Sequence, residues 1–354
     1  MNAIHQSTHK LITGPAQQMD AVADNSIALV VTSPPYPMIA MWDDIFSKQN
    51  QKIGDALSDN DGQQAFELMN QELDKVWKEV DRVLMPGGFA CINIGDATRT
   101  IDGNFSLYAS HARIIQAFVR MGMDNLPNII WRKQTNAPNK FMGSGMLPSG
   151  AYVTLEHEWV LVFRKGGKRK FTTVESKKHR QESAFFWNER NMWFSDLWDL
   201  KGTRQNIKKS ETRKRSAAYP FLIPYRLIQM YSLYGDTVLD PFLGTGTTTM
   251  AAIASHRSSI AYDIDEAFIT SASETISDMS IGFYNEMIES RIVRQKEFLI
   301  NRETNPKKSK PKYHNENLDM AIMTKQELQM QFYDVESISK TEDGFRSFHR
   351  LKNA

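Results

Sequence analysis

Two short segments, far apart in the chain, carry residue types that suit a ligand site. The first is Ser33-Pro34-Pro35-Tyr36, which follows the apolar run from Ile27 to Val31. Its two prolines restrict the backbone, so a hydroxyl, a carbonyl group and an aromatic ring are held in one short loop. Hydroxyl and carbonyl oxygens accept hydrogen bonds from an amine, and a tyrosine ring can stack on a flipped base. Taken alone, the segment is better explained as an ordinary proline turn with a half-buried tyrosine.

The second segment is a glycine turn between a predicted strand and a predicted helix. Its candidate binding residues are Asp240, Pro241, Phe242, Gly244, Gly246, Thr247 and Thr248. Glycines let a ligand approach the backbone, and the first N–H groups of a helix can bind an anionic group. A phosphate-binding P-loop would need a lysine where Thr247 stands, and a dinucleotide motif would need a small residue where Thr249 stands. By itself, the turn is also compatible with one that binds no ligand.

An acidic residue follows the next predicted strand. The strand Ser259 to Tyr262 leads directly into Asp263, with Asp265 two residues further along. A carboxylate at the end of a parallel strand can accept hydrogen bonds from ribose hydroxyl groups. Asp263 is therefore the preferred ribose ligand and Asp265 the second choice.

The elements around these segments predict an α/β fold. Strands are expected at 27–31, 89–94, 128–132, 158–163, 237–239 and 259–262, and helices at 65–84, 108–121, 224–234, 249–255 and 276–300. Pro86-Gly87-Gly88 is expected to end the first of these helices. Alternating strands and helices imply a doubly wound, mostly parallel sheet, in which ligands bind at the carboxyl ends of the strands.

Together, the two motifs resemble those of the DNA amino-methyltransferases, the cytosine-N4 and adenine-N6 enzymes. The catalytic motif of that family is a small polar or acidic residue before Pro-Pro-Tyr or Pro-Pro-Phe, which matches Ser33 to Tyr36. The cofactor motif is Asp-Pro-Phe-x-Gly-x-Gly-Thr-Thr, which matches Asp240 to Thr248. The resemblance covers roughly 26–165 and 219–268, and the motif order is that of the beta group.

The resemblance implies the S-adenosylmethionine-dependent methyltransferase fold in a circularly permuted form. It implies catalytic roles for Ser33, Pro34, Pro35 and Tyr36, and binding of S-adenosylmethionine by the glycine turn and Asp263. The expected reaction is methylation of an exocyclic amine in duplex DNA after base flipping. Serine before Pro-Pro favours cytosine N4 over adenine N6 in this family. Methylation of RNA or of a protein amide, or a DNA-binding module with an inactive cofactor pocket, are the alternatives.

Positive charge is concentrated between the two motifs. Arg164 to Arg215 holds 16 Lys and Arg and 6 Asp and Glu, a balance of +10, whereas the whole chain carries +2. Such asymmetry is typical of a segment that contacts a polyanion, although a solvated lysine-rich loop would look the same. We expect phosphate contacts from five residues, namely Lys208, Lys209, Arg213, Lys214 and Arg215.

These patterns suggest a division of the chain into domains. In the beta group the target-recognition region lies between the motifs, so 166–215 is predicted to be an inserted recognition module. The catalytic domain would comprise 1–165 and 216–300, and a linker and tail would occupy 301–354. The aromatic residues between Phe185 and Trp198 are expected to form the core of the insert, with DNA contact as the alternative.

Composition excludes several other classes. A single cysteine, Cys91, permits no internal disulfide and no Cys-rich zinc site, and Ala90 precedes it where a cytosine-C5 enzyme would have proline. His157-Glu158 lacks a second histidine at helical spacing, so no metal is expected. No apolar run is long enough for a bilayer, and Met1 to Gln18 lacks the apolar core of a secretory signal. We expect a protein of the reducing bacterial or archaeal cytoplasm that binds double-stranded DNA and no membrane, with a companion restriction endonuclease as a further partner.

Overall fold

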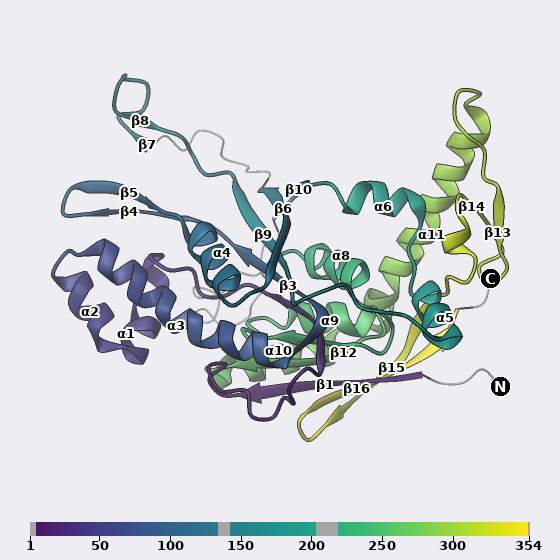
Figure 1. Cartoon of the computed structure of the whole chain (residues 1–354), viewed down its shortest axis with the longest axis horizontal. Helices are drawn as coiled ribbons and strands as arrows, with labels where there is room; N and C mark the ends of the chain where they lie inside the picture. Colours follow the sequence, from purple (N-terminus) through teal and green to yellow (C-terminus); the bar gives the residue numbers. More distant parts are fainter. Residues whose placement is uncertain (1–4, 134–141, 203–218, 353–354) are drawn as a thin grey trace.

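The computed structural model describes residues 5–133, 142–202 and 219–352. A ten-stranded sheet runs through this part of the chain (Figure 1), in the order β10-β6-β9-β3-β2-β11-β12-β1-β16-β15. In that order its strands are β10 (Leu197–Leu200), β6 (Asp124–Lys133), β9 (His157–Arg164), β3 (Leu84–Ile94), β2 (Ile27–Thr32), β11 (Thr237–Asp240), β12 (Ser258–Asp263), β1 (His5–Thr13), β16 (Gly344–Leu351) and β15 (Tyr333–Thr341).

The five central strands, from β3 to β1, are parallel to one another. Strand β9 is antiparallel to both β3 and β6, and β16 is antiparallel to β1. The predicted α/β fold with a mostly parallel sheet is therefore confirmed. Because parallel strands end at one edge, the loops after β1, β2, β11 and β12 lie along the same side of the sheet.

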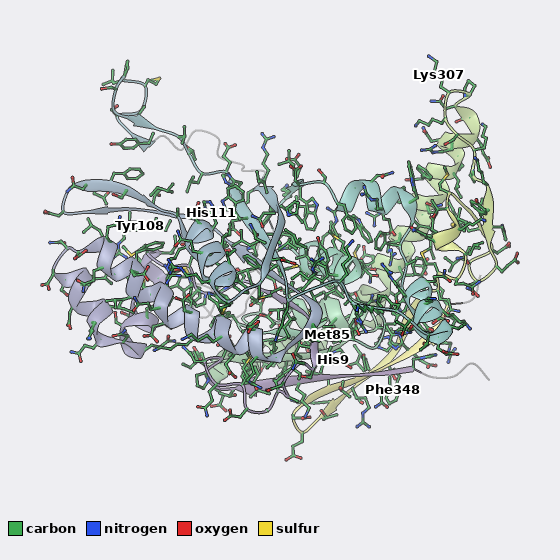
Figure 2. All side chains as sticks on the ribbon, in the orientation of Figure 1. His9, Met85, Tyr108, His111, Lys307 and Phe348 are labelled. Carbon is green, nitrogen blue, oxygen red and sulfur yellow. The ribbon has the colours of Figure 1, made fainter. Side chains whose placement is uncertain are left out.

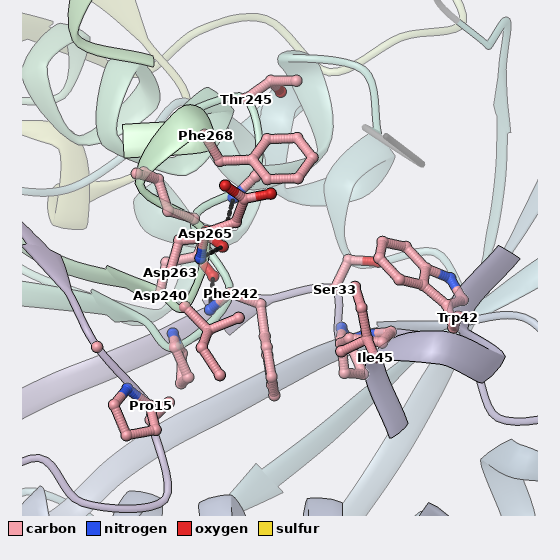
Figure 3. A pocket seen from close by; sticks show the side chains of 18 of the residues that line it. Pro15, Ser33, Trp42, Ile45, Asp240, Phe242, Thr245, Asp263, Asp265 and Phe268 are labelled. Atoms are coloured by element: carbon pink, nitrogen blue, oxygen red, sulfur yellow. Dashed lines mark hydrogen bonds between the residues drawn. The ribbon is translucent and has the colours of Figure 1, made fainter. Parts of the chain in front are cut away.

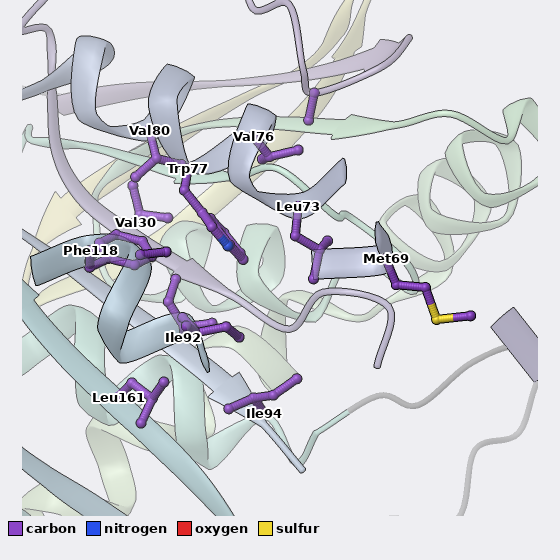
Figure 4. Close-up of a cluster of buried hydrophobic side chains, with 14 of the residues drawn as sticks. Val30, Met69, Leu73, Val76, Trp77, Val80, Ile92, Ile94, Phe118 and Leu161 are labelled. Atoms are coloured by element: carbon purple, nitrogen blue, oxygen red, sulfur yellow. The ribbon is translucent and has the colours of Figure 1, made fainter. Parts of the chain in front are cut away.

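Helices cover both faces of the sheet. One face carries α3 (Gly62–Val83) and α4 (Ser110–Arg120), and the other carries α8 (Leu222–Tyr231), α9 (Thr247–Ala254), α10 (Glu266–Asp278) and α11 (Ile281–Thr304). Strand β2 is buried on both faces. Val30 lies in the cluster with Trp77 and Phe118 (Figure 4), whereas Leu29 and Val31 lie in the opposite cluster. This alternation explains why the strand is apolar throughout.

Smaller elements surround the sheet. Two strand pairs project from the body near the ends of β3 and β6 (Figure 1). These elements are η1 (Ala40–Trp42), α1 (Asp43–Gln49), α2 (Gln51–Ser58), β4 (Ala97–Ile101) with β5 (Asn104–Tyr108), β7 (Met142–Gly143) with β8 (Ala151–Tyr152), β13 (Tyr313–Asn315) with β14 (Met320–Ile322), and η2 (Lys325–Glu327). Among the described residues, no helix is long and apolar enough to cross a membrane.

Two predicted boundaries are wrong. Helix α3 ends at Val83, next to its predicted end, but strand β3 begins at Leu84 and not at Phe89. Pro86-Gly87-Gly88 belongs to this strand, where the register against β2 shifts and the Gly87 N–H donates to the Lys165 carbonyl. The helix predicted at 276–300 is instead two helices. Helix α10 ends at Asp278, and the Ser280 hydroxyl caps α11 by accepting a hydrogen bond from the Phe283 N–H.

The segment 301–354, expected to be a linker and tail, is instead largely folded. Strands β15 and β16 form a hairpin that extends the main sheet beside β1. Only the part around 305–312, after α11, matches the expected linker, since it contains no helix or strand. Lys307 in this loop projects far from the sheet (Figure 2).

The described part of the predicted recognition module is built into the body of the protein. It contributes α5 (Val174–Glu182), α6 (Trp187–Trp193) and strand β10, which pairs in parallel with β6. Phe186 packs against Phe332 at 5.7 Å, and Trp198 is 2% exposed. Phe186, Trp193 and Trp198 are buried, as expected for core residues, but Phe186 and Trp198 belong to clusters that include residues from the rest of the protein. The domain boundaries themselves stay a prediction.

Candidate active site

The two predicted motifs leave neighbouring strands at the same edge. Strands β2 and β11 pair in parallel, with Val30 opposite Leu239, so the Ser33 loop and the glycine turn both follow directly. The Thr32 hydroxyl donates a hydrogen bond of 2.6 Å to Asp240 Oδ1. This bond joins the residue before the Ser33 loop to the first residue of the glycine-turn motif.

A pocket opens where these loops meet (Figure 3). It contains about 950 Å³ of space between atoms, part of it open to solvent, which suits a small-molecule ligand. Most of the predicted site residues line it. They are Ser33, Pro34, Pro35, Asp240, Pro241, Phe242, Gly244, Thr247, Asp263 and Asp265.

The Asp263 carboxylate is held in place by backbone groups. Its Oδ2 accepts a hydrogen bond from the Gly244 N–H and its Oδ1 accepts one from the Asp265 N–H, both at 3.0 Å. Burial raises the pKa of Asp263 to about 6, against the lowering effect of these hydrogen bonds. Gly244 has a φ of +51°, a conformation that favours glycine. Strand β12 and the glycine turn therefore present an oriented carboxylate to the pocket.

Asp240 is more deeply buried, with 3% of its surface exposed. Besides the Thr32 hydroxyl, its Oδ1 accepts a hydrogen bond from the Phe242 N–H at 3.1 Å. Burial raises the pKa of Asp240 to about 7, although these hydrogen bonds favour the ionised form. Asp240 therefore holds the start of the glycine turn in place through these hydrogen bonds.

Two of the predicted cofactor residues, Gly246 and Thr248, lie at the start of α9, outside the pocket lining. Gly246 has a φ of +78° at the start of α9, and a Cβ there would lie 3.1 Å from the Ala272 Cβ. The Thr248 hydroxyl donates to the Val31 carbonyl at 3.3 Å and is hydrogen-bonded to the Tyr219 hydroxyl. Both residues tie α9 to its neighbours and do not line the pocket.

Tyr36 is largely buried, and its stacking on a base stays a prediction. Its ring is 7% exposed and packs in the core, and it is not among the residues that line the pocket. The Tyr36 hydroxyl donates to Glu158 Oε2 at 2.9 Å and lies 3.1 Å from Ser33 Oγ. Burial and the nearby Glu158 raise the pKa of Tyr36 well above its usual range. The tyrosine hydroxyl connects Ser33 to the interior, which the motif alone does not reveal.

Several pocket residues are absent from the sequence prediction. Gly14 to Gln17 follow β1, Trp42 and Ile45 come from η1 and α1, and Phe268 comes from α10. Trp42 lies on the Ser33 side of the pocket and Phe268 on the Asp265 side (Figure 3). The loop after β1 was missed because that strand was not predicted. Tyr219 also lines the pocket, and the sequence could have indicated it, because it directly precedes a segment that resembles the family.

Cys91 lies inside β3 with no exposed surface, and burial raises the pKa of its thiol. The thiol is thus protonated and inaccessible, as expected for a small core residue. The basic residues predicted to contact DNA phosphates lie outside the described residues. They are Lys208, Lys209, Arg213, Lys214 and Arg215.

Known proteins match this chain over most of its length. The family model for N6/N4 DNA methylases matches residues 27–274. The chain is 49% identical to the Type II methyltransferase M.MthZI of Methanothermobacter thermautotrophicus, over 98% of this chain and 97% of that protein. It is also 49% identical to the Type II methyltransferase M.MjaI of Methanocaldococcus jannaschii, over 74% of this chain and 88% of that protein.

Solved structures share the fold. A candidate DNA modification methylase of Thermus thermophilus, in complex with S-adenosyl-L-methionine, is 30% identical with a TM-score of 0.58, over 76% of this chain and 93% of that chain. The cytosine-N4-specific PvuII DNA methyltransferase is 16% identical with a TM-score of 0.54, over 79% of this chain and 92% of that chain, which shows a common fold. The matched motifs, the fold and the near full-length relatives agree, and the chain belongs to the N6/N4 DNA methylase family, as a DNA methyltransferase.

Proposed function

We propose that this protein transfers a methyl group from S-adenosylmethionine to the exocyclic N4 amine of cytosine in duplex DNA. The observation that carries the proposal is the shared pocket, in which Ser33 and the glycine turn face one space. A methyl donor bound by the turn would lie next to a hydroxyl that can accept a hydrogen bond from an amine.

The glycine-turn side of the pocket suits the cofactor. Asp263 presents a carboxylate that can accept hydrogen bonds from ribose hydroxyl groups, and Ile264 and Phe268 provide apolar surface for an adenine ring. Thr247 lines the pocket at the start of α9, and the first N–H groups of a helix suit an anionic group. When bound, S-adenosylmethionine supplies an electrophilic methyl group on a sulfonium. The similar Thermus protein, in complex with S-adenosyl-L-methionine, supports this assignment.

The Ser33 side of the pocket suits the base. We propose that Ser33 Oγ and the Pro34 carbonyl accept hydrogen bonds from the two amine hydrogens, so that the nitrogen lone pair points toward the methyl group. Such positioning accelerates a reaction without a covalent intermediate. Because a paired base could not reach a pocket at the edge of the sheet, the base must leave the duplex. Trp42 lines this side and offers a ring for stacking.

The choice of cytosine N4 rests on Ser33, which precedes Pro-Pro as it does mostly in N4 enzymes of the family. Adenine N6 is the alternative, since both amines make the same hydrogen bonds. The test is to methylate a pool of unmodified duplexes, digest them to nucleosides and identify the product by mass spectrometry. N4-methylcytosine is expected, and N6-methyladenine as the only product would overturn the choice.

The biological setting follows from the relatives. M.MthZI and M.MjaI are named Type II methyltransferases, so we propose a restriction–modification system with a companion endonuclease, acting on DNA in the cytoplasm. We propose that the basic residues of the recognition segment contact the phosphates and so orient the duplex. They are Lys208, Lys209, Arg213, Lys214 and Arg215.

A further inference from the structure

A chain of hydrogen bonds leads from Ser33 away from the pocket into the protein. Ser33 Oγ lies 3.1 Å from the Tyr36 hydroxyl, which donates to Glu158 Oε2 at 2.9 Å. Ser33 lines the pocket, whereas Tyr36 and Glu158 are 7% and 8% exposed. The three groups therefore connect the pocket to a carboxylate that a ligand in the pocket would not touch.

Asn93 determines which group donates and which accepts in these hydrogen bonds. Its side-chain nitrogen donates to the Tyr36 hydroxyl oxygen at 2.9 Å and to Glu158 Oε2 at 2.7 Å. An amide nitrogen only donates, and a carboxylate only accepts, so the hydrogen of the Tyr36 hydroxyl must point to Glu158. The remaining lone pair of Tyr36 can then accept the hydrogen of the Ser33 hydroxyl. Asn93 Nδ2 also lies 3.5 Å from Ser33 Oγ, at the limit of a hydrogen bond. A hydroxyl oxygen has two lone pairs, so Ser33 Oγ can still accept an amine hydrogen from the pocket.

The series of hydrogen bonds that begins at Ser33 ends close to solvent. Glu158 Oε1 is hydrogen-bonded to the Lys133 ammonium group, whose side chain is 41% exposed. Asn93 and Tyr36 contact the other oxygen of Glu158, so all the charge of the carboxylate is paired or hydrogen-bonded. Gly95 leaves room for the pair, because a Cβ there would lie 2.9 Å from the Tyr36 ring and 3.3 Å from the Glu158 side chain.

We propose that Ser33, Tyr36 and Glu158 form a relay that removes the proton released by the methylated amine. The proposal rests on the proposed function, because it requires an amine in the pocket. The amine nitrogen forms a bond to the methyl carbon while the carbon–sulfur bond breaks and its electron pair stays on sulfur. The nitrogen then carries one proton too many. That proton goes to Ser33 Oγ, the Ser33 proton goes to Tyr36, and the Tyr36 proton goes to Glu158 Oε2.

The relay solves a problem of charge. The sulfonium charge moves to the amine during the transfer, and a serine hydroxyl by itself is too weak a base to keep the resulting proton. Through Tyr36 the proton reaches the Glu158 carboxylate. This carboxylate is paired with Lys133, whose side chain is partly exposed to water. Tyr36 and Glu158 act through Ser33 and are therefore positioning residues, while Ser33 and the Pro34 carbonyl contact the amine.

The test measures single-turnover methylation by Tyr36→Phe, by Glu158→Gln and by the double variant. Each single variant keeps the shape of the side chain but cannot pass or keep a proton, so we expect the rate to fall about 100-fold, within the range of general acid–base catalysis. The double variant should fall little further, since either change already breaks the chain. Wild type should show a solvent deuterium isotope effect that Tyr36→Phe lacks.

The controls separate the relay from a structural role. Glu156→Gln removes the same charge two residues earlier in the chain, just before β9, and its rate should match wild type. Dissociation constants for S-adenosylmethionine and for a duplex should stay within about threefold of wild type in each variant, since differences below about 0.7 kcal/mol are small. If Glu158→Gln does not fold, Tyr36→Phe and its isotope effect decide the question.

The possible failures are distinguishable. Wild type without methylation of either base amine would overturn the proposed function and the relay with it. An active wild type together with an unaffected Tyr36→Phe or Glu158→Gln would overturn the relay alone. Losses that multiply in the double variant would also overturn it, because they would show that the two side chains act independently.

Discussion

The Thr32 hydroxyl donates a 2.6 Å hydrogen bond to Asp240 Oδ1, and these two residues end neighbouring parallel strands. Both side chains are buried, at 0% and 3% exposed. The bond joins the strand that leads to Ser33 with the strand that leads to the glycine turn. It therefore fixes the two halves of the pocket relative to each other.

Replacing Thr32 by valine should lower the free energy of unfolding by about 1–3 kcal/mol, because a buried carboxylate loses a donor while the shape of the side chain is kept. Since burial raises the pKa of Asp240 to about 7, the loss should be larger at pH 8, where the carboxylate is ionised, than at pH 5. Urea unfolding at both pH values measures it. Thr32→Ser keeps the hydroxyl and should lose much less, and equal losses for the two variants would contradict the role of the bond.

Binding of S-adenosylmethionine should weaken at low pH. Burial raises the pKa of Asp263 to about 6, so the carboxylate accepts hydrogen bonds fully above about pH 7 and becomes protonated as the pH falls through 6. Titration calorimetry between pH 5 and 8 should show the dissociation constant rising as the pH falls. Asp263→Asn should bind about 10–100-fold more weakly, as expected for loss of a charged acceptor, with no inflection near pH 6. Asp265→Asn should keep the inflection.

Gly246→Ala tests the start of α9. A positive φ costs a non-glycine residue about 1–2 kcal/mol, and the new Cβ would also crowd Ala272 at 3.1 Å. Gly235 is a matched control, because its φ is +74° and a Cβ there would meet nothing within 4 Å. Urea unfolding should show a larger loss for Gly246→Ala than for Gly235→Ala. Equal losses would mean that the contact with Ala272 carries no cost.

Ser33→Ala should affect chemistry more than binding. The variant removes the hydroxyl that accepts the amine hydrogen, and loss of one such group in an active site costs about 100-fold or more in rate. Single-turnover methylation should show this loss, whereas calorimetry should give an unchanged affinity for S-adenosylmethionine. A lost affinity with an unchanged rate would place Ser33 in the cofactor site instead.

Charge removal from the recognition segment should flatten the salt dependence of DNA binding. Each lost phosphate contact reduces the slope of log affinity against log salt by about 0.9. The variant replaces five residues by alanine, namely Lys208, Lys209, Arg213, Lys214 and Arg215. The control replaces four lysines after α11, namely Lys307, Lys308, Lys310 and Lys312. An unchanged slope in the first variant, measured by fluorescence anisotropy, would count against the assignment.

The sequence by itself determined the central strands and both motifs, because each is encoded by local patterns. The all-apolar stretch of β2 marks a strand buried on both faces, and the prolines and glycines that follow β2 and β11 mark where those strands end. Since parallel strands end at one edge, the meeting of Ser33 and Gly244 also followed from the pattern.

Only the tertiary structure decided which polar residues are buried. Strand β1 has no apolar alternation, since its buried residues are Ser7 and His9, and the His9 ring is hydrogen-bonded to Ser259 and Ser347, some 250 and 338 residues away in the chain. The partners of Tyr36 are likewise distant, since Glu158 lies 122 residues along the chain. A polar side chain can be buried only where such partners exist, and partners brought together by the sheet leave no mark in a local pattern.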